Sequence, residues 1–401
     1  MNILSCTTHS NNYQLYTSIK EVPKEVWTTL QCEDSIYLSP DYLEALENHN
    51  PNITFAYLVL LDEANTPTAF TTIQIVDFYL ESVQNDMQSI VDWVKCMGRK
   101  LRIISPETPF KVLTSGNIFV SGEHGIFIKQ DQDKQQIIKD VAKALVAYSN
   151  SHYKGSIDAY MLKDFLTESL YITDELKDDH FNSFQVEPNM ILSLDKSWNT
   201  FDDYLAAMRT KFRVKAKKAM KQSDSLRIED ISIEMLDELL PQMTTLYKTV
   251  TNKAGFNLGD FDLETYKCLK QNLEDQYLLK GYWLENKLVG FMSGIINQDT
   301  LDAHFVGIDY KFNKSYAIYQ RMLYDYIILG IEQNVNYINF GRTASEIKSS
   351  VGAVPQDLTI YLRHKKTIPN KILSLFLNKI KPTAFKQKLP FKEVIQVLKT
   401  N

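Results

Sequence analysis

The sequence has few cysteines, and their spacing forms no recognisable site. Cys6, Cys32, Cys96 and Cys268 lie far apart, with no C-x-x-C motif among them. This spacing argues against a zinc site or a disulfide framework and is typical of a reducing compartment, so we expect no bound metal. The start of the chain has no basic region followed by an apolar run, and no apolar run approaches the ~20 residues of a membrane span. These absences together predict a cytoplasmic protein.

Length and composition are typical of a globular protein with two domains. The chain has 401 residues, of which 44% are hydrophobic and 23% are charged. Its net charge of −5 is unevenly placed, because residues 363–401 carry ten Lys or Arg and one acid, whereas the rest carries 34 bases and 48 acids. A basic tail on an acidic body predicts that the tail meets a negative surface.

Hydrophobic periodicity predicts two halves that run through their elements in the same order. Each half has helices, antiparallel strands, a long helix, a strand, a short helix and a strand. We interpret them as two copies of one mixed α/β (α+β) unit, residues 1–194 and 195–365, with an insertion near residues 80–115 and a basic amphipathic tail at 366–401. The helices are predicted at residues 22–30, from 40 onward, 86–97, 135–149, 163–176, 233–251, 262–273 and 316–333. The strands are predicted at residues 53–61, 68–78, 111–120, 125–128, 156–162, 185–194, 277–285, 287–297, 300–308, 337–340 and 358–363.

A short apolar strand at residues 337–340 stops at Gly341 and is followed by a burst of polar side chains. Strand ends of this kind build sites in open α/β sheets. Thr343 and Glu346 have the T-x-x-E spacing of a helix capping box. A well-capped strand–helix junction without any function explains the same pattern. The polar residues are Arg342, Thr343, Ser345, Glu346 and Lys348.

Residues 200–221 predict a basic amphipathic helix between the two halves. Thr200 and Asp203 are spaced as an N-cap pair, and residues 209–221 hold seven bases and no acid. Because like charges repel, a negative partner is expected nearby, although a merely solvated basic helix is the alternative. The apolar face comprises Leu205, Met208, Phe212, Ala216 and Ala219. The side chains expected to hold a phosphate-bearing substrate or an RNA backbone are Lys211, Arg213, Lys215 and Lys218.

Residues 201–221 and 339–353 together resemble bacterial proteins of the GNAT acetyltransferase superfamily. They are most similar to its tandem-domain branch, which includes the Fem-type peptidyltransferases of cell-wall synthesis and uncharacterised peptidoglycan-biosynthesis or GNAT-like proteins. The resemblance is strongest over residues 195–365. It implies two tandem GNAT-like domains and an N-acyltransferase in which an amine attacks a thioester directly, without a covalent enzyme intermediate.

The resemblance also implies where a donor would bind. The pyrophosphate of acyl-CoA normally rests on backbone N–H groups at the start of the long helix after the third central strand, here residues 307–316. The glycine-rich loop of the family is absent, and Phe312 and Tyr316 stand in its place. Acyl-CoA is one expected donor, and aminoacyl-tRNA, which Fem-type enzymes use, is the other. The cofactor-binding candidates are Lys311, Lys314, Ser315 and Tyr316.

Three residues are the catalytic candidates of the second half. Arg342 could clamp an anion or pair with Glu346 or Asp357. Glu346 could be a general base or only a helix cap, and His304 could accept the proton of the amine or lie satisfied in the core. The remaining substrate-binding candidates are Gly341, Thr343 and Lys348, the last of which is a surface lysine in the alternative interpretation. Glu123 and His124 could line a second cleft or form a polar turn.

The tail places Ile372, Leu375, Phe376 and Ile380 along one helical stripe among lysines. Such a helix lies on an anionic membrane or packs on its own domain. We therefore predict a cytoplasmic transferase, membrane-associated at the inner surface in the first case. It would move an acyl or aminoacyl group to an amine of a cell-envelope precursor or small metabolite. The alternatives are a Fem-type ligase that uses aminoacyl-tRNA and a non-catalytic binding or scaffold protein.

Overall fold

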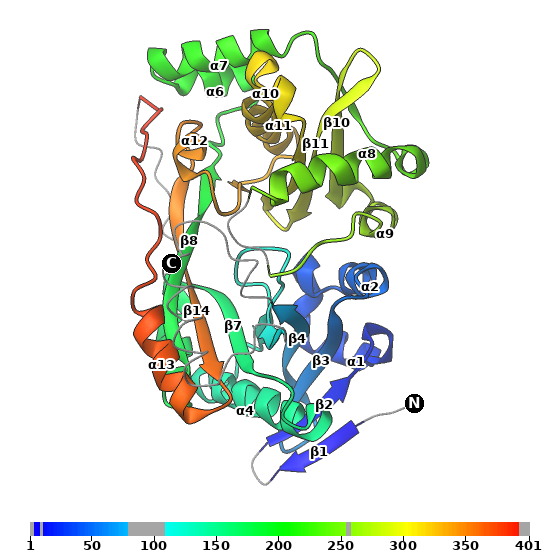
Figure 1. Ribbon diagram of the computed structural model, residues 1–401, viewed down its shortest axis with the longest axis vertical. Helices are drawn as coiled ribbons and strands as arrows, with labels where there is room; N and C mark the ends of the chain where they lie inside the picture. Colours follow the sequence, from blue (N-terminus) through cyan, green and yellow to red (C-terminus); the bar gives the residue numbers. More distant parts are fainter. Residues whose placement is uncertain (1–3, 9–10, 79–108, 254–257, 393–401) are drawn as a thin grey trace. The chain divides into compact units, whose positions relative to one another are not determined.

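The computed structural model describes residues 4–8, 11–78, 109–253 and 258–392 (Figure 1). The described residues form two compact units, each drawn from separate parts of the chain. Unit 1 lies within Met1–Glu187, Ala254–Asp262 and Asp357–Pro382, and unit 2 within Pro188–Lys253, Leu263–Gln356 and Thr383–Asn401. The predicted division after residues 194 and 365 stays a prediction. The predicted helix at 86–97 lies outside the described residues.

Unit 1 is built on a mixed sheet with strand order β1-β2-β3-β4-β5-β7-β14, and β6 pairs with β4. Its strands are antiparallel to their neighbours except β5 and β7, which run parallel. Helices α1 and α2 lie on one side of this sheet and α4 on the other (Figure 1). The elements are β1 (Leu4–Thr8), β2 (Asn11–Tyr16), α1 (Lys24–Leu30), α2 (Pro40–His49), β3 (Thr54–Leu61), β4 (Pro67–Phe78), β5 (Phe110–Ser115), β6 (Ile126–Ile128), α4 (Lys134–Tyr153), β7 (Ala159–Leu166), α5 (Leu170–Thr173), β14 (Val354–His364) and α13 (Thr367–Leu377).

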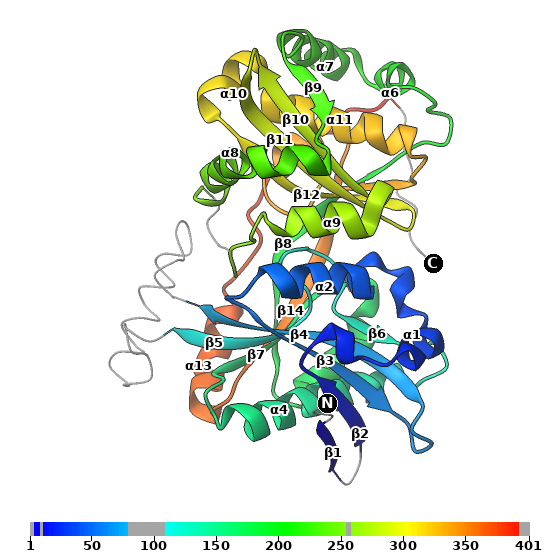
Figure 2. The same cartoon turned by 90° about the vertical axis from the view of Figure 1, so that its right-hand side faces the viewer.

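Unit 2 has the strand order β8-β13-β12-β11-β10-β9, again with one parallel pair, β12 and β13. Helices α8 and α9 lie on one side of this sheet and α11 on the other (Figure 2). The elements are β8 (Asn182–Ser193), α6 (Phe201–Ala207), α7 (Thr210–Gln222), β9 (Arg227–Asp230), α8 (Ile233–Thr251), α9 (Thr265–Leu273), β10 (Tyr277–Leu284), β11 (Lys287–Asn297), β12 (Thr300–Ile308), α10 (Tyr310–Tyr316), α11 (Ile318–Glu332), β13 (Tyr337–Asn339) and α12 (Ser345–Ser349).

The predicted repeat is confirmed at the level of topology. In each unit three antiparallel strands lead into a long helix and then into a strand parallel to the third: β3-β4-β5, α4 and β7 in unit 1, and β10-β11-β12, α11 and β13 in unit 2. The last strand of each half contributes to the other sheet, because β8 pairs with β13 and β14 pairs with β7. Each unit therefore contains the mixed α/β arrangement that the sequence predicts.

Local signals in the sequence explain where several helices begin. The Ser39 side chain accepts a hydrogen bond from the Tyr42 N–H at 3.3 Å, with Pro40 in the first turn of α2. Thr200 and Asp203 cap each other's backbone N–H groups at the start of α6, so this predicted N-cap is confirmed. None of the helices in the described part of the chain is long and apolar enough to cross a membrane.

Two predicted helices differ in the structure, and tertiary contacts explain both differences. The basic helix breaks at Met208, which is extended and bridges to Phe391, so α6 and α7 are separate helices. The predicted helix at 163–176 is wrong at its start, because β7 continues to Leu166 and only short helical turns follow. Lys163 and Asp164 lie within that strand as a buried ion pair, which periodicity alone cannot predict.

Candidate active site

The strands β12 and β13 stop pairing where β13 ends, and a cluster of polar residues lies at this point. They pair in parallel over three positions, the last of which joins Asp302 to Asn339. β13 then ends, whereas β12 continues to Ile308. We call Asp302, Asn339, Gly341, Arg342 and Lys348 the β13 corner.

A chain of hydrogen bonds connects the two strands at this corner. The Asn339 side chain donates from Nδ2 to Asp302 Oδ1 at 2.9 Å and accepts the Gly341 N–H at Oδ1, also at 2.9 Å. The Gly341 carbonyl oxygen in turn accepts Lys348 Nζ at 3.1 Å. Because Asp302, Asn339 and Lys348 are all buried, each of these bonds is shielded from competing water.

Lys348 is the most unusual group in the corner, because its amine is buried beside carbonyl oxygens. The residue is 4% exposed, and Nζ donates to the Gly341 and Arg342 carbonyl oxygens at 3.1 and 2.6 Å. Burial lowers the pKa of the Lys348 amine to about 7. Lys348 is therefore not the surface lysine of the alternative interpretation, and a large share of its amines is neutral near neutral pH.

The turn that carries these carbonyl groups has an unusual backbone. Gly341, Thr343 and Ala344 have φ values of 70°, 67° and 50°, in the left-handed region where a residue with a Cβ costs about 1 kcal/mol. The predicted capping box is therefore wrong, because Ala344 rather than Thr343 precedes α12 and the helix has no side-chain cap. The contacts from Lys348 hold the turn in this conformation.

Glu346 points to a different partner from the one that the sequence predicts. Its carboxylate pairs with Lys388 Nζ at 2.6 Å, and this contact lowers the pKa of Glu346. Lys386 and Lys215 add weaker attraction. An exposed, paired carboxylate is a weak general base. Arg342 is half-buried at the turn, where its carbonyl oxygen accepts Lys348 Nζ.

His304 lies at an irregularity in the pairing of β12 with β11, among side chains of α9 and β10. Ser293 occupies the irregularity, where its Oγ accepts the Phe305 N–H at 3.0 Å and donates to the Phe305 carbonyl at 3.1 Å. The imidazole lies 6.3 and 6.2 Å from the rings of Tyr266 and Tyr277, and burial lowers the pKa of His304 to about 3. An imidazole that stays neutral to this extent accepts a proton poorly.

The first turns of α10 and α11 do not fit a diphosphate held by backbone N–H groups. Asn313 Oδ1 accepts the Tyr319 N–H in the first turn of α11 at 2.9 Å, and Asp309 Oδ1 accepts the Lys311 N–H in α10 at 3.1 Å. Side chains of the chain itself already bind these N–H groups, and one of them is a carboxylate that repels phosphate. Lys311, Lys314 and Ser315 are exposed, and Tyr316 is half-buried.

The predicted basic surface is present on α7. The residue Arg213 is half-buried, with Nη1 3.5 Å from the Met208 carbonyl oxygen. The exposed lysines of this helix are Lys211, Lys215, Lys217, Lys218 and Lys221. One of them, Lys215, also lies near enough to Glu346 of α12 to attract its carboxylate. Among the described residues, no group of three or more His, Cys, Asp or Glu could hold a metal ion.

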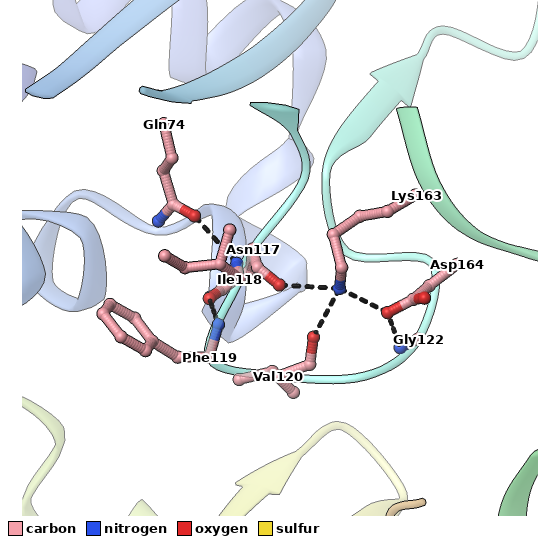
Figure 3. Close-up of polar contacts among 8 residues, drawn as sticks. All are labelled: Gln74, Asn117, Ile118, Phe119, Val120, Gly122, Lys163 and Asp164. Carbon is pink, nitrogen blue, oxygen red and sulfur yellow. Dashed lines mark hydrogen bonds and ion pairs between the residues drawn. The ribbon is translucent and has the colours of Figure 1, made fainter. Parts of the chain in front are cut away.

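Unit 1 has its own buried lysine at the end of its parallel strand pair (Figure 3). Lys163 Nζ donates to the carbonyl oxygens of Asn117 and Val120 at 2.8 and 3.0 Å and pairs with Asp164. The Asp164 carboxylate also accepts the Gly122 N–H at 3.4 Å. In unit 1 the charge of the buried lysine is thus neutralised by the Asp164 carboxylate.

The neighbouring side chains of Glu123 and His124 also have partners within the protein. Glu123 accepts the Leu166 N–H at 3.1 Å and the Ser169 hydroxyl at 2.8 Å. The His124 ring packs against Tyr37 with ring centroids 4.3 Å apart and a tilt of 44° between the rings, and burial lowers the pKa of His124 to about 4. These contacts give Glu123 and His124 a clear structural role.

Sequence reasoning missed Asp302 and Asn339. Each is a polar residue inside an apolar strand, in Leu301-Asp-Ala and Ile338-Asn-Phe. That pattern is a usable signal, because a buried polar side chain needs a hydrogen-bonding partner. Only the register of β12 with β13 identifies the partner.

No protein-family model matches the sequence, and no curated protein matches it either. Solved structures do match. The crystal structure of FemX aligns with a TM-score of 0.51 at 10% identity, over 85% of this chain and 96% of FemX. A tandem GNAT protein from the clavulanic acid biosynthesis pathway, solved without AcCoA, aligns with a TM-score of 0.53 at 7% identity, over 88% of this chain and 99% of that protein. The chain therefore has the tandem GNAT fold that the sequence predicts.

Proposed function

We propose that the protein is an N-acyltransferase with its reaction centre at the β13 corner of unit 2. In the proposed reaction the nitrogen of an acceptor amine attacks the carbonyl carbon of an ester or thioester. A C–N bond forms and the C–O or C–S bond breaks. The amine loses a proton to a base, and the departing alkoxide or thiolate takes up a proton.

The buried amine of Lys348 is the observation that carries this proposal. Its pKa of about 7 matches the operating range of a general base, whereas the imidazole of His304 does not. Its counterpart in unit 1, Lys163, is neutralised by Asp164. We therefore assign the role of base to Lys348, and Asp302 and Asn339 position the turn to which Lys348 is bound.

Arg342 is proposed to bind the anionic part of the acceptor. Its side chain is half-buried next to the turn, and a guanidinium is the group that binds a carboxylate or phosphate through two parallel hydrogen bonds. Amines that also carry such a group include amino-acid side chains in cell-envelope precursors and many small metabolites. This chemistry defines the proposed acceptor class.

Aminoacyl-tRNA is the donor that two further observations favour. The first-turn N–H groups of Tyr319 and Lys311 are already bound by Asn313 and Asp309, which disfavours the diphosphate of acyl-CoA at that place. The five exposed lysines of α7 suit an RNA backbone. An aminoacyl ester carried on tRNA, as in the Fem-type alternative, needs no diphosphate site.

The test compares donors and then removes the base. The full chain is incubated with charged tRNA or acetyl-CoA and a mixture of lysine, alanine and a muramyl pentapeptide, and amide products are measured by mass spectrometry. We expect amide formation to rise as the pH increases through about 7, and to fall by two to four orders of magnitude in Lys348→Met. The matched control is Lys143→Gln, an exposed lysine of α4 in unit 1.

Three outcomes decide between the alternatives. Amide product from charged tRNA alone supports aminoacyl-tRNA as the donor. Amide product from acetyl-CoA alone excludes aminoacyl-tRNA as the donor. Equal rates for Lys348→Met and the unmodified protein would exclude Lys348 as the base. No product with either donor, with the fold intact by circular dichroism, would favour the non-catalytic binding protein.

A further inference from the structure

Unit 1 contains a cationic pocket beside α13 that the proposed reaction does not use. The pocket has a volume of about 520 Å³, within the range of small-ligand sites. Among the residues that the structure describes, four cationic side chains and no carboxylate line it: Lys177, Arg363, Lys365 and Lys371. The other polar lining residues are His180, Asn182, Ser183, His364, Thr367, Asn370, Ser374 and Asn378. A pocket with this lining suits an anionic ligand with hydroxyl groups.

Two of the four cations already have carboxylate partners outside the lining. Lys177 Nζ lies 2.6 Å from Asp174 Oδ1, and Lys365 Nζ lies 2.9 Å from Asp158 Oδ1. Arg363 is half-buried, and its guanidinium lies 5.8 Å from the centre of the Phe181 ring. Arg363 and the exposed Lys371 therefore supply most of the uncompensated charge.

Asn370 fixes α13 against the rest of the pocket. Its Oδ1 accepts the His364 N–H at 2.8 Å and Asn182 Nδ2 at 3.2 Å, and its Nδ2 donates to the His180 carbonyl oxygen at 2.8 Å. Phe376 and Leu377 are buried and hold the other end of the helix. The pocket is therefore preorganised, which lowers the entropy lost when a ligand binds.

A different face of α13 exposes apolar side chains next to this charge. Ile368 and Leu375 are 70% and 63% exposed, and the half-buried Ile372 falls between them at helical spacing. We call these three residues the α13 apolar stripe. The pocket-facing positions of the helix are Thr367, Asn370, Lys371, Ser374 and Asn378. One helix thus presents a cationic polar face and an apolar face side by side.

We propose that α13 docks unit 1 on an anionic phospholipid bilayer, with a lipid phosphate in the cationic pocket and the apolar stripe in the acyl region. Charge and apolar surface both favour a lipid over a soluble phosphate, because a soluble ligand would leave Ile368 and Leu375 in water. A phosphodiester headgroup carries one negative charge, which complements Arg363 and Lys371. This docking is independent of the acyltransferase reaction, and its test needs no catalysis.

The test is cosedimentation of the full chain with vesicles of two compositions. One contains phosphatidylcholine with one-third phosphatidylglycerol, and the other contains phosphatidylcholine alone. We expect binding to the first only, weakening as salt increases. Arg363→Gln and Lys371→Gln should each lower the partition coefficient about fivefold. The double variant Ile368→Ser with Leu375→Ser should lower it at least about tenfold.

Two matched controls in unit 1 lie away from the pocket and the stripe. Lys143→Gln removes an exposed lysine of α4, and Tyr171→Ser removes an apolar side chain that is 68% exposed. Both should bind vesicles like the unmodified protein. Thermal unfolding of every variant checks that the fold is intact.

Several results would overturn the docking proposal. These are no binding to phosphatidylglycerol vesicles, equal binding to both vesicle types, or losses in the controls as large as those in the pocket variants. Calorimetry with glycerol 3-phosphate tests whether the pocket binds a soluble phosphate rather than a lipid phosphate. The pocket would be assigned to a soluble phosphate instead if three results hold together. The compound binds tightly, Arg363→Gln weakens that binding, and the protein does not bind vesicles.

Discussion

The amine of Lys348 lies 3.1 Å from the carbonyl oxygen of Gly341, seven residues earlier in the chain. The lysine therefore folds back on the turn that precedes its own helix and fixes the end of β13. Burial of this amine, together with its contacts to the turn after β13, makes it both a structural and a titratable feature of unit 2.

The pH dependence of stability should report the Lys348 amine. Its pKa is about 7 in the folded chain and 10.5 ordinarily, so between these values the unfolded chain binds one more proton. The free energy of unfolding should therefore rise with pH in this window, by up to about 1.4 kcal/mol per pH unit. Below about pH 7 both states are protonated and this contribution stays constant.

Urea unfolding of the unmodified protein and Lys348→Met at about pH 6, 8 and 10 measures this effect. The difference between the two proteins should change in favour of the unmodified chain as pH rises. Curves that stay parallel over the whole range would show that the amine keeps its ordinary pKa.

Removing the buried carboxylate of Asp325 should destabilise unit 2 strongly. Its oxygens accept Arg321 Nε at 2.8 Å and the Tyr282 hydroxyl at 2.6 Å, and so connect two positions of α11 to β10. Asp325→Ala leaves both donors without this acceptor, and we expect a loss of about 3–5 kcal/mol in the free energy of unfolding. The control, Lys129→Gln, breaks an exposed pair and should cause no measurable change. A loss in Asp325→Ala as small as in the control would contradict the assigned role.

Ser293→Ala should weaken the attachment of β12 to β11 at the irregularity in their pairing. The mutation removes the acceptor of the Phe305 N–H and the donor to its carbonyl oxygen, and we expect a loss of about 1–3 kcal/mol. Hydrogen exchange should show faster exchange at the Phe305 amide, with β13 amides unchanged. Ser151→Ala, an exposed site on α4, is the control. Unchanged protection at Phe305 would mean that another group takes over from Ser293.

Binding of tRNA should depend on α7. Lys215→Gln and Lys218→Gln remove exposed lysines without touching buried side chains. Each should weaken binding of uncharged tRNA and reduce the slope of log K against log salt by about one for each phosphate that is no longer neutralised. Filter binding at several salt concentrations measures both quantities, with Lys143→Gln as the control. If the slope of log K against log salt is equal in all variants, the RNA binds at another surface or does not bind.

Secondary structure was predictable wherever local pattern and burial agreed. The strands at 287–297 and 300–308 and the helix at 233–251 have the predicted bounds, because long apolar runs with clear turns leave few alternatives. The prediction of one basic helix over residues 201–221 was wrong at Met208, where an extended bridge to Phe391 replaces helical bonding. A contact with a residue so distant in sequence leaves no periodic signal.

The sequence predicted the strand end at Gly341 but not the contacts that its polar residues make. Gly341 predicted a strand end with polar residues, and Lys348 and Arg342 do meet there. Glu346 has the spacing of a helix cap, yet it pairs with Lys388 in the tail. The sequence offered His304 and Glu346 as proton acceptors, whereas burial lowers the pKa of His304 to about 3 and that of Lys348 to about 7.

The sequence by itself determined the order of elements, the repeated α/β topology and the charge of α7 and the tail, since these follow from composition and short-range periodicity. Only the tertiary structure decided that Asn339 joins Asp302 to Gly341, that Lys348 is buried while Lys163 is neutralised, and that α13 turns its polar face to a cationic pocket. The physical reason is that burial and long-range pairing depend on strand register and helix packing, which residues near each other in sequence do not specify.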